Sequence, residues 1–231
     1  MRFDVITVFP EIVSDYKKLG IIARAISKKL ISIHARNLRD YAVDERKTVD
    51  DRPYGGGFGM VLKPDIMLKA IKDVAGRSGK KTRIILLTPA GRVFSQAHAK
   101  RLANYDRLVL VSGRYEGFDE RISKFVDEEI SIGDYVLMGG ELPALVMIEA
   151  ISRFIPGVVG KQESVQTETF SDGILEYPQY TRPEILKAGK KYLRVPKILL
   201  SGDHKKIEIW RADQALKKTK KIRPDLIKKE F

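Results

Sequence analysis

The sequence predicts an α/β fold in which helices cover both faces of a parallel sheet, followed by a small basic helical domain. Strand-like and helix-like segments alternate along the first two thirds of the 231 residues, as they do in parallel α/β proteins. Two strand-like runs, "IILL" (84–87) and "LVLV" (108–111), are wholly apolar, which is typical of strands buried on both faces. Positive charge is concentrated near the C-terminus.

The spacing of apolar residues predicts the elements of the first domain in order. The segment 44–63 is polar, rich in glycine and too long for an ordinary connection. The helix at 12–30 would have an apolar face formed by Leu19, Ile22, Ala23 and Ile26. The full series is a strand at 2–10, a helix at 12–30, a strand at 31–38, the loop at 44–63, a helix at 64–76, a strand and turn at 82–91, a helix at 95–105, a strand and turn at 106–117, a helix at 119–126, a short strand and loop at 127–137, and an apolar helix from Pro143 to Arg153.

The net charge of +13 is unevenly distributed. Residues 182–231 contain 16 Lys or Arg against 6 Asp or Glu, whereas residues 1–181 contain 27 against 24. A basic field of this kind suits a polyanion such as RNA. A solvated, lysine-rich helix face would give the same composition.

The loss of periodicity after about residue 160 divides the chain. We expect a catalytic α/β domain at 1–160, a linker at 161–178 and a basic helical domain at 179–231. Within the last domain, 204–222 is expected to be an amphipathic helix with Ile209, Ala212 and Leu216 on one side and lysines elsewhere.

Several classes of function are excluded by composition and motif. The chain has no cysteine, so disulfides, thiolate zinc sites, iron–sulfur clusters and cysteine nucleophiles are absent. Its three histidines lie in different predicted elements, so no metal site is expected. Neither the dinucleotide fingerprint nor the P-loop is present with the required spacing. No segment approaches eighteen consecutive apolar residues, so we expect a soluble, cytoplasmic protein without membrane contact.

Three glycine-bearing turns follow strands of the predicted sheet, at 86–92, 110–117 and 131–141. Ligands of parallel α/β sheets bind beyond the carboxyl ends of the strands. The three turns are therefore expected to converge on one pocket. The charged residues near it, each of which could equally be a salt-bridge partner, are Arg114, Glu116, Asp134, Glu141 and Arg153.

Five segments then carry a specific resemblance: "RPYGGGFGM", "GRYEGFDERI", "SIGDYVLMGGELPALVMIEAISRFIPG", "YTRPE" and "VPKILLSGDHKKIEIWR". They resemble the signature segments of the bacterial tRNA (guanine-N1)-methyltransferases, the TrmD family of the SPOUT superfamily, and they occur in the family's order. The resemblance implies a trefoil knot in the α/β domain, S-adenosylmethionine as methyl donor, and a homodimer whose active sites are built from both subunits. It also implies methylation of guanosine 37 of tRNA, on the 3′ side of the anticodon, which helps to maintain the reading frame.

The same resemblance assigns the three turns to the cofactor. Gly139 and Gly140 are expected to let the backbone approach the cofactor where a Cβ atom would collide. The residues expected to bind S-adenosylmethionine are Pro89, Gly91, Gly113, Tyr115, Glu116, Ile132, Gly133, Asp134, Tyr135, Val136, Leu137, Gly139 and Gly140.

Methylation at guanine N1 needs a base that removes the N1 proton and a donor that stabilises the charge on O6. The resemblance implies that Arg153 is the donor. The aspartate that the family uses as base aligns with Glu168, whose side chain is one methylene longer. Asp172 is a second acidic candidate, and Glu168 could also be solvated linker charge.

The resemblance further implies that the basic C-terminal domain binds the tRNA backbone. The expected phosphate contacts are Lys205, Lys206 and Arg211, with the cluster 217–223. Arg52 and Tyr54 of the long loop are expected to approach the flipped base. The family uses Mg²⁺, held either by protein or by substrate. Two alternatives remain at this point: a SPOUT enzyme that methylates another position, such as a ribose 2′-hydroxyl, and a basic RNA-binding protein without catalysis.

Overall fold

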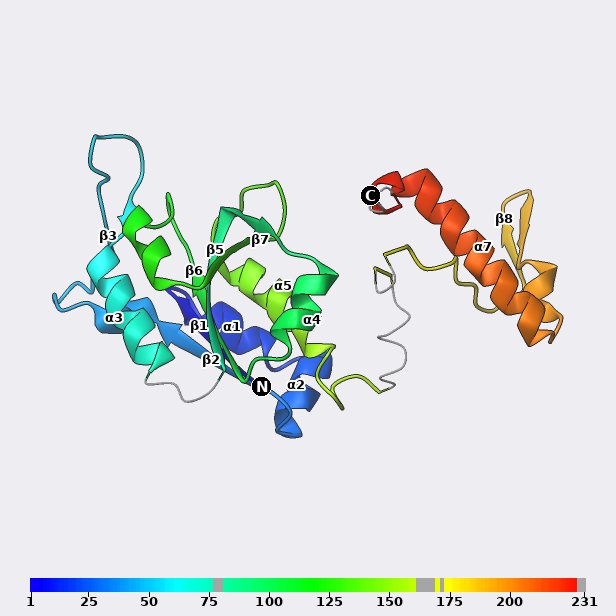
Figure 1. The fold of residues 1–231 in the computed structure, drawn as a ribbon, viewed down its shortest axis with the longest axis horizontal. Helices are drawn as coiled ribbons and strands as arrows, with labels where there is room; N and C mark the ends of the chain where they lie inside the picture. Colours follow the sequence, from blue (N-terminus) through cyan, green and yellow to red (C-terminus); the bar gives the residue numbers. More distant parts are fainter. Residues whose placement is uncertain (77–80, 161–168, 171–172, 228–231) are drawn as a thin grey trace. The chain divides into compact units, whose positions relative to one another are not determined.

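The computed structural model describes residues 1–76, 81–160, 169–170 and 173–227. The chain divides into two compact units, Met1–Gln162 and Glu163–Phe231 (Figure 1). The first unit contains a five-stranded sheet with its helices, and the second contains a two-stranded hairpin and a long helix. Among the described residues, we find no helix with the length and hydrophobicity that a membrane crossing requires.

The sheet of the first unit is wholly parallel, with the strand order β2-β1-β6-β5-β7. Phe3 lies beside Ile33 on one side and beside Leu108 on the other. This confirms the predicted parallel α/β class. The strands are β1 (Arg2–Thr7), β2 (Ser32–Asn37), β5 (Thr82–Val93), β6 (Arg107–Ser112) and β7 (Glu128–Ser131).

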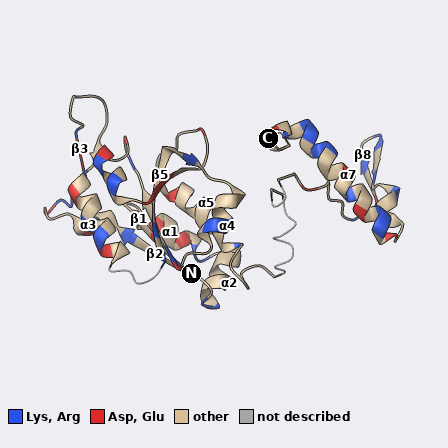
Figure 2. Cartoon of the chain, in the orientation of Figure 1, with Lys and Arg blue, Asp and Glu red and all other residues tan. Residues whose placement is uncertain are grey.

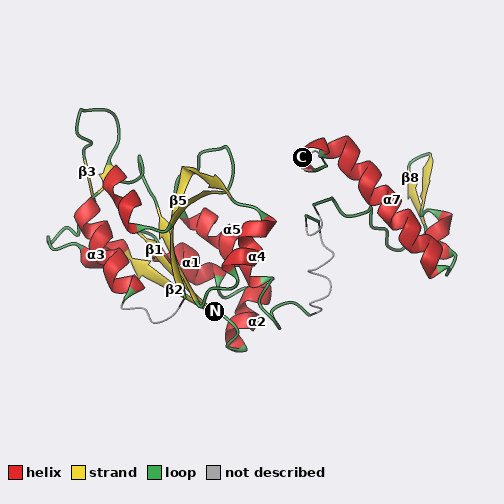
Figure 3. Cartoon of the chain, viewed as in Figure 1, coloured by secondary structure: helices red, strands yellow, loops and turns green. Residues whose placement is uncertain are grey.

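Both faces of the sheet are buried, and the central strand β6 shows why its sequence is wholly apolar. Leu108 and Leu110 face one core cluster, and Val109 and Val111 face the other. The first cluster includes residues of α1 (Pro10–Tyr16), α2 (Gly20–Ser27), α4 (Gln96–Leu102) and α5 (Glu141–Ser152), and the second includes residues of α3 (Pro64–Ala75) and two 3-10 helices, η1 (Leu38–Tyr41) and η2 (Glu120–Phe125). Helices therefore cover both faces, as predicted (Figure 3).

The prediction of one continuous helix at 12–30 is wrong. The segment forms two helices, α1 and α2, and Gly20 at the start of α2 has a φ of +58°. The left-handed backbone at this glycine changes the direction of the chain. Leu19, expected on the apolar face, is 67% exposed, whereas Ile22 is buried.

Two further elements differ from their predictions. The helix expected at 119–126 is the short 3-10 helix η2, and β5 continues past the expected turn to Val93. The pairing of β5 with β7 is interrupted between Leu87 and Arg92, where the register shifts, and resumes at Arg92. The predicted loop at 44–63 contains a short antiparallel pair, β3 (Asp50–Asp51) and β4 (Val61–Leu62). The predicted helix at 64–76 is confirmed as α3, with Gly76 after its last residue.

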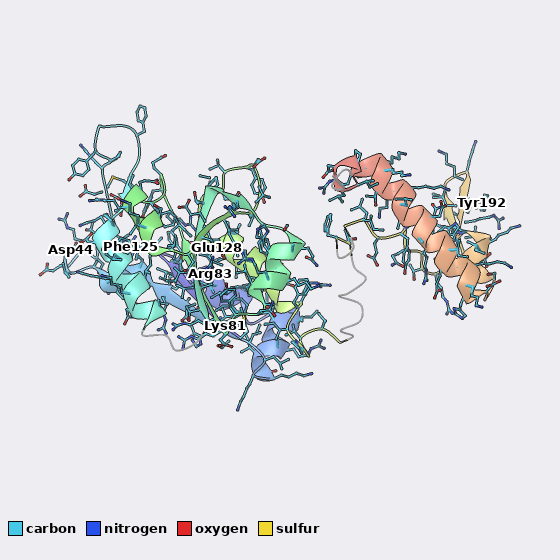
Figure 4. All side chains as sticks on the ribbon, viewed as in Figure 1. Asp44, Lys81, Arg83, Phe125, Glu128 and Tyr192 are labelled. Atoms are coloured by element: carbon cyan, nitrogen blue, oxygen red, sulfur yellow. The ribbon has the colours of Figure 1, made fainter. Side chains whose placement is uncertain are left out.

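Glu128, the first residue of β7, ties the edge of the sheet to its neighbours. Its carboxylate accepts hydrogen bonds from Arg83 Nε of β5 at 2.8 Å and from Arg101 Nη2 of α4 at 2.6 Å (Figure 4). Burial raises the pKa of Glu128, but the hydrogen bonds from Arg101 and Arg83 outweigh it and hold the pKa below its ordinary value. The hydrogen bonds of Glu128 with Arg83 and Arg101 hold β7 in position. β7 ends at Ser131, where the third predicted turn begins.

The second unit is built around α7 (His204–Ile222), along which Lys and Arg are numerous (Figure 2). Its other elements are the hairpin of β8 (Ile185–Ala188) and β9 (Lys191–Arg194) and the 3-10 helices η3 (Lys197–Leu200) and η4 (Pro224–Leu226). Residues 173–178, part of the expected linker, contact α7: Leu175 N donates to Thr219 Oγ1 at 2.9 Å, and Lys218 Nζ donates to Glu176 O at 3.1 Å.

The prediction that Ile209, Ala212 and Leu216 form the packed face of α7 is wrong. Ile209 is 71% and Leu216 is 41% exposed. The buried residues are Ile207, Ala215 and Thr219. They belong to a different i, i+4 row of the same helix, and this row faces the segment that packs on α7.

Candidate functional site

The three predicted turns line one cavity at the carboxyl ends of β5, β6 and β7. It has a volume of about 340 Å³, within the range of small-molecule sites. The turn after β6 contributes Gly113 to Glu120, and the segment after β7 contributes Ile132 to Gly140. The pocket predicted from the three strand-end turns is therefore present.

Most of the residues expected to bind the cofactor lie in this lining. They are Pro89, Gly113, Tyr115, Glu116, Ile132, Gly133, Tyr135, Val136, Leu137, Gly139 and Gly140. Gly91 and Asp134 are not among the lining residues. A Cβ atom on Gly91 would lie 2.5 Å from the backbone nitrogen of Ile130, so this glycine allows β5 to approach β7. Asp134 is exposed.

The adjacent glycines, Gly139 and Gly140, which both line the cavity, also have a steric role within the protein. A Cβ atom on Gly140 would lie 2.7 Å from Ser112 Cα and 2.8 Å from Gly113 N. One on Gly139 would collide with the side chain of Arg114. Gly140 N also donates to Gly113 O at 2.9 Å. The glycines thus let the chain pass directly against the end of β6, and the collision they avoid is with the protein's own backbone and side chains.

A buried network holds this crossing in place. Glu141, which is 1% exposed, accepts hydrogen bonds from Thr7 Oγ1 at 2.5 Å and Arg114 Nε at 3.0 Å. The Arg114 guanidinium also lies over the ring of Phe9, 4.4 Å from its centroid. Arg114 and Glu141 are therefore salt-bridge partners, the alternative that the sequence left open for each.

The cavity is acidic. Among the described residues that line it, the charged side chains are four carboxylates, Glu116, Asp119, Glu120 and Glu129, and one guanidinium, Arg114. The charge of Arg114 is balanced by Glu141. A hydrogen bond from Arg121 lowers the pKa of Asp119, so this carboxylate is ionised at neutral pH. Such a site attracts a cation and repels phosphate groups.

Sequence reasoning missed part of the lining. Leu87, Phe118, Met138 and Pro143 also contribute to it. Phe118 packs against Gly113, where a Cβ atom would lie 2.8 Å from its ring. Leu87 and Met138 lie inside the predicted turns at 86–92 and 131–141 but were not assigned to the site. Phe118 and Pro143 lie within two residues after a predicted turn. Taking each turn whole and extending it by two residues would have found all four.

The glycine-rich loop reaches the same cavity. Glu116 N donates to Met60 O at 2.9 Å, and a Cβ atom on Gly59 would collide with the Glu116 side chain. Within the loop, Arg52 is exposed and Tyr54 is 100% exposed. These two predicted substrate contacts are thus available on a loop anchored beside the cavity.

Arg153 is the one predicted catalytic residue that lies within the described part of the chain. Arg153 follows the last residue of α5, and α5 begins at the cavity. At a rise of about 1.5 Å per residue, the twelve residues of α5 place Arg153 roughly 18 Å along the helix from that end. Glu168 and Asp172 lie outside the described residues.

The predicted tRNA contacts on α7 occupy two different faces. Lys205 and Lys206 are exposed at its first turn, and Lys206 Nζ pairs with Asp203 at 2.9 Å. Arg211 instead lies in the same row as Ile207 and Ala215, on the packed face. Across the part of the chain that the structure describes, no group of three or more His, Asp or Glu side chains could hold a metal ion.

A model of the family described as tRNA (guanine-1)-methyltransferase TrmD matches residues 1–229. The chain belongs to this family. Its relatives include the tRNA (guanine-N(1)-)-methyltransferase of Thermotoga petrophila, 48% identical over 98% of this chain and 90% of the relative. Relatives of the same name from Thermosipho africanus and Geobacter sulfurreducens are 50% and 48% identical over 100% and 99% of this chain, and over 92% of each relative. TrmD membership thus extends over both compact units.

Proposed function

We propose that this protein transfers the methyl group of S-adenosylmethionine to N1 of guanosine 37 in tRNA. Membership of the TrmD family supports tRNA guanine-N1 methylation as the reaction. The observation in the structure that carries the proposal is the acidic cavity formed by three strand-end turns. The family description does not name a tRNA position, so position 37, beside the anticodon, is our proposal.

The lining of the cavity fits S-adenosylmethionine. Glu116, Glu120 and Glu129 would attract its positive charges, whereas a nucleoside triphosphate would be repelled. Apolar side chains such as Leu87, Ile132 and Leu137 offer walls for the adenine ring. When bound, the sulfonium group supplies an electrophilic methyl group.

The residues of the chain must then deprotonate N1 and stabilise O6. Glu168, or alternatively Asp172, would accept the N1 proton. The Arg153 guanidinium would donate hydrogen bonds to O6 as negative charge moves onto it. No step is assigned to Mg²⁺, because no group of three or more His, Asp or Glu side chains among the described residues could hold it.

We further propose that the active enzyme is a homodimer. Phe9 and Ile12 of the α1 segment and Leu142 and Val146 of α5 are 36% to 56% exposed, and α1 contacts α5. This is a large apolar surface for two adjacent helices. A twofold axis across this surface could place the α5 helices antiparallel, so that the partner's Arg153 approaches the cavity.

The crossing of residues 131–140 over the end of β6 supports the proposal of a trefoil knot in this unit. Gly139 forms an isolated bridge with Arg114, and Gly140 contacts Ser112 and Gly113. We propose that residues 1–160 form the knotted methyltransferase domain, 161–178 the linker and 179–231 the tRNA-binding domain. The charge of the last fifth of the chain supports the last assignment.

The test is mass spectrometry of nucleosides from tRNA incubated with the protein and S-adenosylmethionine. We expect N1-methylguanosine, and none when adenosine replaces guanosine 37. A 2′-O-methyl product would contradict the proposal and favour another SPOUT enzyme. Calorimetry with S-adenosylmethionine alone separates the remaining alternative, because an RNA-binding protein without catalysis would give no heat.

A further inference from the structure

The second compact unit contains a cavity of its own. Its volume is about 500 Å³. Its walls combine apolar and aromatic side chains with two arginines, Arg182 and Arg211, and one carboxylate, Glu184; Tyr177, Tyr180, Val195 and Ile207 also line it. Tyr180 also lies beside Trp210, with 6.5 Å between the ring centroids. This cavity is separate from the three turns, and nothing in the proposed methyl transfer uses it.

Arg211 occupies an unusual position for an arginine. It lies in the row Ile207, Arg211, Ala215 and Thr219, whose other members are buried against the rest of the unit. Arginine is among the residues least often placed in such a row unless it is paired. Here the Arg211 Cζ atom lies over the Tyr177 ring, 4.7 Å from its centroid.

The guanidinium of Arg211 is held by stacking and not by an ion pair. Within the described residues it has no carboxylate partner, and its Nε atom is shut off from solvent without a hydrogen-bond acceptor. Buried polar groups are nearly always satisfied. An arginine stacked on a tyrosine at a cavity wall, with its Nε atom left without an acceptor, is suited to a ligand that brings both a flat face and acceptor atoms.

We propose that this cavity binds one unpaired base of the tRNA, distinct from the guanine that is methylated. The inference rests on the proposed function, which makes tRNA the substrate. Unpaired RNA bases bind proteins by stacking on aromatic rings and arginine planes, with hydrogen bonds to their edges. Val195, Leu199 and Ile207 supply apolar walls that suit a base. A phosphate group would instead bind the exposed cations of α7, such as Lys220 and Lys221, because it stays hydrated there.

The experiment compares three variants of the full-length protein. Arg211→Gln removes the guanidinium, Val195→Phe fills the cavity without changing charge, and Lys220→Gln removes an exposed cation of the same helix as a control. The tRNA dissociation constant is measured over a range of salt concentrations. In parallel, the reactivity of each tRNA base to dimethyl sulfate and carbodiimide is mapped with and without protein.

We expect Arg211→Gln and Val195→Phe to weaken tRNA binding by about tenfold or more, with little change in the salt dependence. Both should expose one unpaired base that the wild type protects. Lys220→Gln should keep that protection and lower the salt slope by about one. A fall of about one in the slope for Arg211→Gln, with base protection unchanged, would identify a phosphate contact and overturn the proposal. Unchanged affinity for Val195→Phe would do the same.

Two controls separate this inference from the proposed function. The affinity of each variant for S-adenosylmethionine and its thermal unfolding show whether it is folded, and if Arg211→Gln does not fold, Val195→Phe decides the result. Formation of N1-methylguanosine by the wild type is measured separately. If the wild type forms this product while both cavity variants bind tRNA normally, only the base-binding cavity is refuted. If the wild type forms none, the proposed function itself fails.

Discussion

The Arg114 guanidinium and the Glu141 carboxylate form an ion pair in which Nη2 and Oε2 are 2.9 Å apart. The pair joins the turn after β6 to the first residue of α5, and Thr7 at the end of β1 completes it. Because all three segments converge beside the cavity, the pair links the stability of the fold to the shape of the cavity.

Glu141→Gln should therefore affect both properties. The substitution leaves the partly buried Arg114 without its counterion, and we expect a loss of about 3 kcal/mol of unfolding free energy. The affinity for S-adenosylmethionine should fall by about tenfold or more, since 139–141 loses its anchor. Urea denaturation and calorimetry measure the two effects. Glu45→Gln, at an exposed glutamate, is the matched control, and an unchanged cofactor affinity in Glu141→Gln would show that the pair has only a structural role.

A single methyl group at Gly140 should disturb the cavity. In Gly140→Ala the added Cβ would meet backbone atoms of Ser112 and Gly113, which cannot move aside as a flexible side chain could. We expect a loss of about 1–3 kcal/mol of stability and weaker cofactor binding. Gly160→Ala is the control, because a Cβ atom there has no neighbour within 4 Å. Equal behaviour of the two variants in thermal unfolding and calorimetry would refute this steric argument.

Asp4 should make the protein sensitive to acid. Its buried side chain accepts hydrogen bonds from Arg2 Nε at 2.7 Å and Arg107 Nε at 2.8 Å. Burial alone would raise the pKa of Asp4, but the hydrogen bonds from Arg2 and Arg107 lower it below the ordinary value. A carboxyl with a lowered folded-state pKa stabilises the protein above its unfolded pKa, and this contribution is lost as the pH falls through the folded value.

We therefore expect the wild type to lose stability below about pH 4. Asp4→Asn should cost about 3–5 kcal/mol near neutral pH, because Arg2, Arg36 and Arg107 lose their counterion, and should reduce the slope of stability against pH below 4. Urea denaturation at several pH values measures both. Parallel pH profiles for the wild type and Asp4→Asn would contradict the assignment.

The homodimer can be tested by mixing two defective chains. Arg153→Gln would remove the O6 donor, and Gly140→Ala would disturb the cavity, so each homodimer should have little activity. If each site combines the cavity of one chain with the partner's Arg153, a mixed dimer contains one intact site. An equal mixture should then recover about a quarter of the wild-type rate, since half of the dimers are mixed. Mass measurement verifies that mixed dimers form. If methyl transfer then does not recover, the cavity and the Arg153 of each site belong to the same chain.

The identity of the base can be decided by single-turnover kinetics. Glu168→Gln should slow methyl transfer by about a hundredfold or more while leaving tRNA affinity unchanged. Asp172→Asn makes the same change to the other candidate and serves as its control. If only Asp172→Asn is slow, Asp172 is the base; if both variants retain full activity, neither carboxylate has this role.

The cavity could be predicted from the sequence because the carboxyl ends of parallel strands lie at one edge of a sheet. The apolar runs at 84–87 and 108–111 identify buried parallel strands, and ligands bind at the carboxyl ends of such strands. The packed face of α7 could not be predicted in this way. Its sequence contains two rows with apolar residues, one through Ile209 and one through Ile207, and only tertiary contacts decide which is buried.

The role of Gly140 shows a second limit. Its motif identifies a close approach of backbone, but the approaching atoms belong to Ser112 and Gly113. Those residues are far from Gly140 in sequence, and the contact exists only after the chain crosses the end of β6. The local sequence therefore indicates that position 140 needs a small residue. Which atoms exclude a larger one is known only from the tertiary structure.

The acidic lining of the proposed cofactor cavity has a consequence for turnover. Methyl transfer removes the positive charge from sulfur, so the product S-adenosylhomocysteine loses part of its attraction to Glu116, Glu120 and Glu129. The same carboxylates that favour binding of the donor thus favour departure of the spent molecule. The charge of the cavity would in this way limit product inhibition.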